Sequence, residues 1–187
     1  MSSSPDAAHA ANVQAIRESF GRVVYSHKTH EKAREIESAK ADRAKWINIV
    51  LVTVTSGTLL TSVITDQRIL LYVSSGVSAL AFAFTIFQLS FTPERTAEQH
   101  RAVAKELWHV REQYVHLLTD IQTDPQAVDI PRRRDELVNE LKYIYRLAPD
   151  TSGDAYRAAQ MALQINEDMT FSNEELNRFL PEALRIT

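Results

Sequence analysis

The amino-acid sequence predicts an all-α membrane protein, in which a two-helix transmembrane hairpin is continuous with long cytoplasmic helices and is followed by a small C-terminal helical region. Three observations carry this prediction. Two long apolar stretches lie next to each other and contain no Asp, Glu, Lys, Arg or His. Only four of the 187 residues are glycine, and no segment alternates apolar and polar residues as strands do. On both sides of the apolar stretches, apolar residues recur at helical spacing.

Residues 1–45 are predicted to form an N-terminal cytoplasmic helix. Its apolar positions follow a 3–4 spacing from Val13 to Val23 and turn polar toward the first apolar stretch. No proline or glycine occurs between residues 22 and 56. We therefore expect this helix to run into the first membrane span without a break.

Residues 46–92 are predicted to form the transmembrane hairpin, with spans at 46–65 and 69–91. At 1.5 Å rise per residue, each span is long enough to cross a hydrocarbon core of about 30 Å. Only the residues 66–68 separate the spans, so the connection is a tight turn. The mean hydropathy of -0.25 resembles that of a soluble protein because the rest of the chain is strongly polar. The alternative is a buried hairpin inside a soluble helical protein.

The distribution of basic residues predicts the orientation of the hairpin. Basic residues flank both spans on the side of the termini: Lys32, Arg34, Lys40, Arg43, Lys45, Arg95, Arg101 and Lys105. The connecting turn has only Arg68, offset by Asp66. Because positively charged loops stay in the cytoplasm, both termini are expected there and the turn outside. The net charge of -3, without a long basic run, argues against nucleic acid as the partner.

Residues 93–187 are predicted to form a C-terminal cytoplasmic helical domain. Pro93 marks a restart of the helix, and a one-sided apolar seam follows it at 4-3-4-3-4 spacing. The seam consists of Val103, Leu107, Val110, Tyr114, Leu117 and Ile121. It is expected to assemble cytoplasmic helices, with the N-terminal helix as natural partner, from one chain or several. A new helix is expected at Pro131, a loop at 148–153, and a capping box at 172–175 that starts a short final helix.

Hydroxyl and amide side chains within the spans are the candidate pore-lining residues. They recur every seven residues at Asn48, Thr55 and Ser62 in the first span and at Ser78 and Thr85 in the second. Small polar residues in membrane helices commonly mediate helix–helix contacts, which is the alternative interpretation. Two helices cannot enclose a pore, so a water-filled path would need a homo-oligomer.

Candidate chemistry outside the spans is sparse. His27, His30 and Glu31 could share one helix face and hold a metal, but their spacing is not the HExxH signature and no third ligand is evident. A polar patch at a helix interface is the preferred interpretation. Arg132, Arg133 and Arg134 form the best candidate anion-binding site, against the alternative of a solvated helix start. There are no cysteines, no P-loop and no nucleophile motif. We therefore assign no catalytic residue, no metal and no cofactor.

Several segments together resemble the SLATT family, two-transmembrane effector domains associated with bacterial nucleotide-signalling conflict systems. The resemblance rests on residues 25–33 (YSHKTHEKA), the position of the hairpin, residues 143–149 with 154–156, and residues 171–176 with 179–185. It implies a growth-arresting effector in the bacterial inner membrane that acts in defence against phage. It also implies control by a nucleotide second messenger or by a partner sensor protein.

Three functional classes follow. The first is an oligomeric effector that forms a pore in, or perturbs, the lipid bilayer. The second is a non-conducting membrane anchor or scaffold that recruits a cytoplasmic partner. The third, a membrane enzyme, is disfavoured because the sequence has no reactive constellation.

Overall fold

The computed structural model describes residues 5–65, 68–126 and 128–186, and every regular element in these ranges is helical. The elements are α1 (Pro5–Thr65), α2 (Arg68–Ser90), α3 (Pro93–Thr123), α4 (Ile130–Leu147), α5 (Gly153–Gln164), α6 (Asn173–Phe179) and the 3-10 helix η1 (Glu182–Leu184). The all-α prediction is confirmed. Asp66 and Gln67, in the predicted outer turn, lie outside the described residues.

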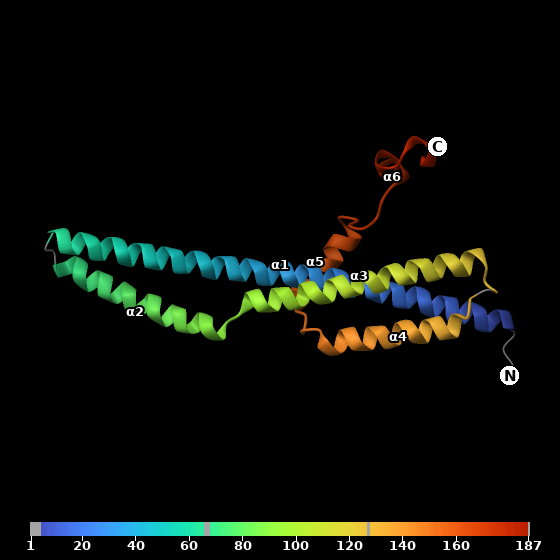
Figure 1. Ribbon diagram of the computed structural model, residues 1–187, viewed down its shortest axis with the longest axis horizontal. Coiled ribbons are helices and arrows are strands. Elements are labelled where there is room, and N and C mark those ends of the chain that lie inside the picture. Colours follow the sequence, from blue (N-terminus) through green and yellow to red (C-terminus); the bar gives the residue numbers. More distant parts are fainter. Residues whose placement is uncertain (1–4, 66–67, 127, 187) are drawn as a thin grey trace.

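The molecule is a rod built on α1, a single helix of 61 residues. Figure 1 shows α1 running almost the full length, with α2 and then α3 returning beside it. The N-terminus lies at one end of the rod and the turn between α1 and α2 lies at the other. The predicted unbroken passage from the cytoplasmic helix into the first span is confirmed. A movement of the N-terminal part of α1 is therefore mechanically connected to the span.

An elbow at residues 90–93 separates α2 from α3. Helix α2 ends at Ser90, and Pro93 occupies the first turn of α3, where its missing N–H is tolerated. Just before the elbow, the Gln88 Nε2 donates a hydrogen bond to the Ala44 carbonyl oxygen of α1 at 3.1 Å. This bond holds the base of α2 against α1 at the predicted inner membrane boundary.

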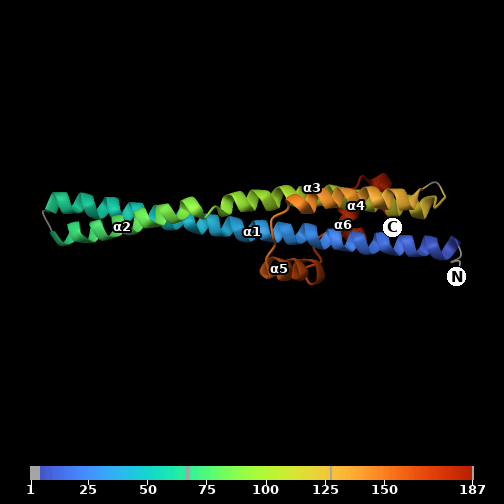
Figure 2. The same cartoon turned by 90° about the horizontal axis from the view of Figure 1, so that it is seen from below.

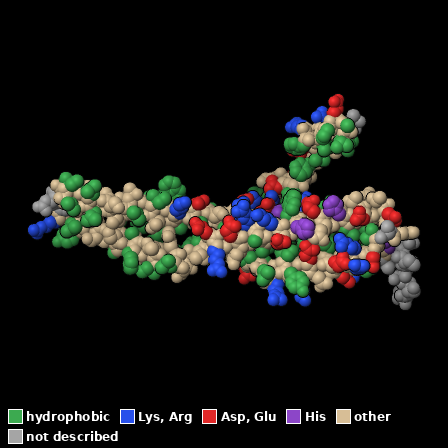
Figure 3. Space-filling view, in the orientation of Figure 1, with side chains coloured by type: hydrophobic (Ala, Val, Ile, Leu, Met, Phe, Trp, Pro, Cys, Tyr) green, Lys and Arg blue, Asp and Glu red, His purple; other side chains and the backbone are tan. Residues whose placement is uncertain are grey.

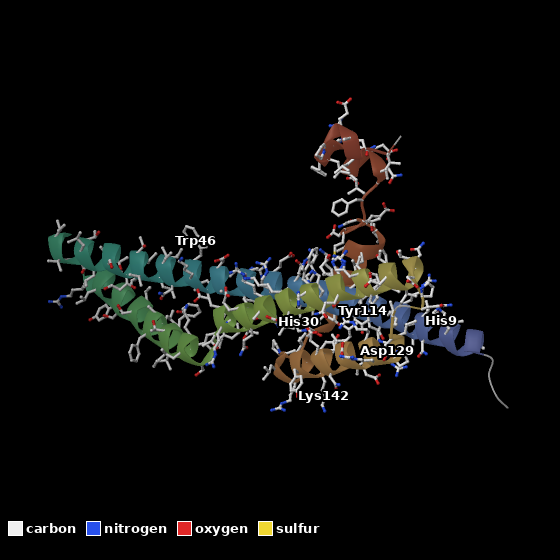
Figure 4. The ribbon with its side chains drawn as sticks, turned by 45° about the vertical axis from the view of Figure 1, so that its right-hand side comes forward. His9, His30, Trp46, Tyr114, Asp129 and Lys142 are labelled. Atoms are coloured by element: carbon white, nitrogen blue, oxygen red, sulfur yellow. The ribbon has the colours of Figure 1, made fainter. Side chains whose placement is uncertain are left out.

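The hairpin exposes its apolar side chains. Only 6% of the most apolar window in each span is buried, and both helices are long and apolar enough to cross a membrane. Trp46, at the predicted boundary, is 66% exposed on the outside of α1 (Figure 4). On the face shown in Figure 3, charged side chains cover the half of the rod that contains α3, α4 and the N-terminal part of α1, called the polar half below. They are rare between the elbow and the tip of the hairpin. In water such a surface would be a large exposed apolar patch, whereas in lipid it is solvated.

The polar half has its own hydrophobic core, formed by α1, α3 and α4. Ile16 and Val23 of α1 and Leu137 of α4 are fully buried and pack with the apolar side chains of α3. Figure 2 shows α4 lying along α3, while α5 crosses α1 on the other side. Helix α5 buries only alanines, which lets its backbone approach α1 closely.

The C-terminal helix α6 forms but does not pack on the rod. Its capping box is as predicted: the Glu175 N–H donates to the Ser172 Oγ, and the Ser172 N–H donates to the Glu175 Oε2. None of its residues is buried, and it projects from the rod in Figure 1. The expectation that the tail is an ordered part of the fold therefore holds for its local structure but not for its packing. The cap fixes the helix locally, whereas one chain offers no apolar partner for Phe179.

Candidate functional site

Residues 25–31 of α1 form a polar hub on which α3, α4 and α5 converge. His27, Lys28, Thr29 and His30 are each at most 8% exposed, which is unusual for polar side chains. Figure 4 places His30 among the packed helices of the polar half. Buried polar groups must be satisfied by partners, so the contacts of this segment specify how the helices meet.

Two histidines of the hub bind α3. The His27 Nδ1 lies 2.9 Å from the Ala104 carbonyl oxygen and donates to it. The His30 Nδ1 lies 2.9 Å from the His100 Nδ1, so one ring donates and the other accepts. Burial, together with the nearby His100 and His27, lowers the pKa of His30 to about 4. The His30–His100 pair is therefore neutral at physiological pH.

Tyr25 and Ser26 of the hub bind α4 and α5. The Tyr145 hydroxyl of α4 donates to the Ser26 Oγ at 3.1 Å. The Gln164 Nε2 of α5 donates to the Tyr25 hydroxyl at 2.7 Å, and the Tyr25 ring stacks on Tyr156 with centroids 6.1 Å apart. These polar contacts explain why α5 docks across α1 although it buries only small side chains.

Lys28 ties the hub to the segment between α5 and α6. Its Nζ lies 3.0 Å from the Glu31 Oε2 and 3.0 Å from the Asp168 Oδ2. Burial lowers the pKa of Lys28, but the bonds to Glu31 and Asp168 outweigh it, and the net pKa is raised. Both neighbours of Asp168, Glu167 and Met169, adopt positive φ angles of 53° and 71°. The Lys28 bond thus helps to hold a backbone conformation that side chains disfavour.

The contacts of the two hub histidines are with other protein groups. The His27 Nε2 lies 3.7 Å from Glu31, and His30 turns to His100. Within the described ranges, no group of three or more His, Cys, Asp or Glu side chains could hold a metal ion. The arrangement joins α1 to α3, α4 and α5.

The Arg132–Arg134 cluster lies at the start of α4, and its charges are paired locally. Asp129 caps the helix by accepting from the Arg132 N–H. Arg132 and Arg133 both bond Glu136, at 3.0 and 2.6 Å, and Arg134 bonds Asp135. The structure thus places carboxylates where a bound anion would have to sit. Anion binding at this corner stays a prediction.

The predicted seam on α3 lies inside a single chain. Its six residues, Val103, Leu107, Val110, Tyr114, Leu117 and Ile121, are each at most 7% exposed. They face α1 and α4 of the same chain in one cluster, so one chain supplies both sides of the stalk. Contacts of this seam between chains stay untested.

The candidate pore residues divide between two environments. Asn48 and Thr55 are half-buried and Ser62 is 6% exposed, in the interface between α1 and α2. Ser78 and Thr85 are exposed on α2. The hydroxyls of Thr55, Ser62 and Thr85 donate to carbonyls of their own helices at 2.7 to 2.8 Å. These bonds satisfy the hydroxyls without water, so they do not by themselves identify a pore face.

Sequence reasoning did not identify His100, Tyr145, Gln164 or Asp168 as partners of the hub. The pairing of His30 with His100 joins positions 70 residues apart, and no local spacing indicates it. The one usable signal was the dense run of polar residues at 25–32 within an otherwise amphipathic helix.

Comparisons with known proteins agree with this architecture. Residues 13–175 match the model of the family described as SMODS and SLOG-associating 2TM effector domain family 4, SLATT_4. The match includes the hub, both spans, the elbow and helices α3 to α5. Comparisons with curated proteins and with solved structures found no match. The chain belongs to the SLATT family of two-transmembrane effector domains, and within it to family 4.

Proposed function

We propose that this protein is a non-enzymatic effector of the bacterial inner membrane, which oligomerises and forms a pore when a nucleotide signal or a sensor partner triggers it. The observation that carries the proposal is the exposed apolar surface of the hairpin, joined without a break to a folded cytoplasmic junction. Opening the membrane would arrest growth, as expected of a defence effector.

The pore requires several copies, because two helices cannot surround a water-filled path. The α1 stripe at Asn48, Thr55 and Ser62 is covered by α2 of its own chain. We therefore favour the exposed Ser78 and Thr85 face of α2 as the lining of the assembled pore. A ring of hydroxyls or small apolar groups is a workable gate.

The proposed trigger acts through the two helices that enter the hairpin. Helix α1 is continuous, and α3 is joined to α2 through the elbow at Pro93. A change in the packing of α1 against α3 would therefore alter the spacing of the spans. The proposed topology has both termini in the cytoplasm, as the basic residues around the spans predict.

Membrane depolarisation in cells that express the protein tests the proposal. Wild-type protein should depolarise the membrane and arrest growth, and Thr85→Leu should weaken both effects because it narrows and dries the lining. Thr53→Leu is the matched control, since Thr53 is an exposed hydroxyl residue on α1 with the same internal hydrogen bond. Growth arrest with an intact membrane potential would contradict pore formation. If Thr53→Leu loses depolarisation and Thr85→Leu retains it, the assignment of the lining to α2 is contradicted.

A second candidate function is a non-conducting scaffold, and α6 favours it. Phe171 is 61% exposed, Phe179 79% and Ile186 67%, on a segment that does not pack on the rod. Such apolar side chains suit a cytoplasmic protein partner. A non-conducting scaffold would bind its partner while the membrane potential of cells that express the wild-type protein stays intact.

A further inference from the structure

A groove of about 590 Å³ lies between α1 and α3. It begins at the hub and extends from it toward the hairpin. Its walls carry three basic side chains, Arg34 from α1 and Arg101 and Lys105 from α3. Trp108, His27 and Glu31 also line the groove. The volume is within the range of sites for small molecules.

The groove has an excess of positive charge that the protein does not neutralise. Among the described residues, neither Arg34 nor Lys105 forms an ion pair with a carboxylate. Arg101 lies 3.4 Å from Glu98, but both side chains are more than half exposed, so this pair is weak. The one acidic wall residue, Glu31, is already bonded to Lys28 at 3.0 Å. This differs from the Arg132–Arg134 cluster, where carboxylates pair the arginines.

Trp108 gives the groove a planar apolar wall. Its side chain is 44% exposed, and its ring lies 5.4 Å from that of His27. The Arg111 guanidinium lies 4.6 Å from the centre of the indole and holds it in place. A planar ring next to three cations suits an anion that itself carries a ring.

The position of the groove favours a soluble ligand over a lipid headgroup. Along α1, Trp46 lies twelve positions after Arg34, which corresponds to a rise of about 18 Å at 1.5 Å per residue. The headgroup layer of one leaflet is only about 5–8 Å thick. A lipid phosphate at the boundary would therefore not reach Arg34.

The geometry points to a binding site in this groove for a small soluble molecule that bears two or more phosphate groups and a planar ring. The phosphates lie against Arg34, Arg101 and Lys105, and the ring lies against Trp108. The ligand bridges α1 and α3, the two helices that lead into the hairpin. Its role as the trigger rests on the proposed function, whereas the binding itself does not.

Trp108 fluorescence tests the site directly, because Trp46 and Trp108 are the two tryptophans of the chain. In the full-length Trp46→Phe protein in detergent, ATP should quench Trp108 saturably, and inorganic pyrophosphate should compete with it. Arg34→Gln and Lys105→Gln should each raise the Kd about tenfold by removing one charge-assisted contact. Lys142→Gln is the control, since Lys142 is exposed on α4 away from the groove (Figure 4). Added salt should weaken binding.

Equal quenching of the Trp46→Phe protein with and without Arg34→Gln or Lys105→Gln would overturn the site, provided that the melting temperatures match. Quenching by vesicles containing phosphatidylglycerol, with none by ATP or pyrophosphate, would assign the groove to lipid and overturn the soluble ligand. Saturable, variant-sensitive quenching in a protein that never conducts would support the groove and contradict the pore. A pore that opens while neither ATP nor pyrophosphate binds in the groove would support the pore and contradict the groove.

Discussion

Acidification should destabilise the polar half of the rod, because His30 is buried as a neutral ring against His100. The pKa of His30 is about 4 in the folded protein, against an ordinary value of 6.5. Burial also lowers the pKa of His27 and of His100, although Glu37 partly offsets the effect at His100. Between pH 4 and pH 6.5, the unfolded chain therefore binds more protons than the folded chain. Stability is therefore fully present above pH 6.5 and falls as the pH drops toward 4.

The size of the effect follows from the pKa of His30. At pH 5 the His30 ring is protonated in the unfolded chain and largely unprotonated in the folded chain. The ordinary pKa of 6.5 lies about 1.5 pH units above this pH. This corresponds to about 2 kcal/mol of unfolding free energy for His30. A protein of this length should lose about 4–8 °C in melting temperature.

Thermal melting in detergent, followed by circular dichroism at pH 7.5 and pH 5, measures this loss. The double variant His30→Leu/His100→Leu replaces both partners by apolar groups of similar size and should lose markedly less stability on acidification. His116→Gln, at an exposed position of α3, should behave like wild type. If wild type and the double variant lose the same stability between the two pH values, the buried pair is not the cause and the reasoning fails.

Three further predictions concern packing and topology. Leu107→Asp buries an unpaired charge at a 0% exposed position and should cost at least about 4 kcal/mol of stability. Val115→Asp, at a 37% exposed position of α3, should be tolerated. Equal melting temperatures for the two variants would show that the seam is not a core. Thr55→Leu overpacks the interface of α1 with α2 and should cost about 1–3 kcal/mol, while Thr53→Leu should not; an unchanged melting temperature for Thr55→Leu would place this stripe outside the interface. A reporter fused after Thr187 should be active only in its cytoplasmic form, and a periplasmic signal would reverse the topology.

Local signals in the sequence predicted most of the helical elements. The absence of proline and glycine between residues 22 and 56 predicted one continuous helix, and Pro93 predicted the break after the hairpin. The capping box at Ser172 and Glu175 predicted where α6 begins. Each of these signals acts within one or two helical turns, so it can be recognised without knowing which helices are neighbours.

The contacts of the hub and the groove could not be predicted in this way, because they join residues far apart in the sequence. Lys28 meets Asp168 across 140 positions, and Arg34 shares a groove with Lys105. Arg132 and Arg133 looked like an anion site, but the carboxylate that pairs them, Glu136, is one turn away on the same helix. The i,i+3 and i,i+4 spacing of these charges was visible in the sequence and is the signal that favours local pairing.

Single-channel recording from the purified protein in planar bilayers, with the oligomer mass measured on the same sample, tests the pore proposal most directly. We expect discrete conductance from a stable oligomer once ATP or a sensor partner is added, and a reduced conductance for Thr85→Leu at unchanged mass. A stable oligomer that never conducts, with ATP bound in the groove and with partner present, would contradict the pore and leave the membrane scaffold as the function.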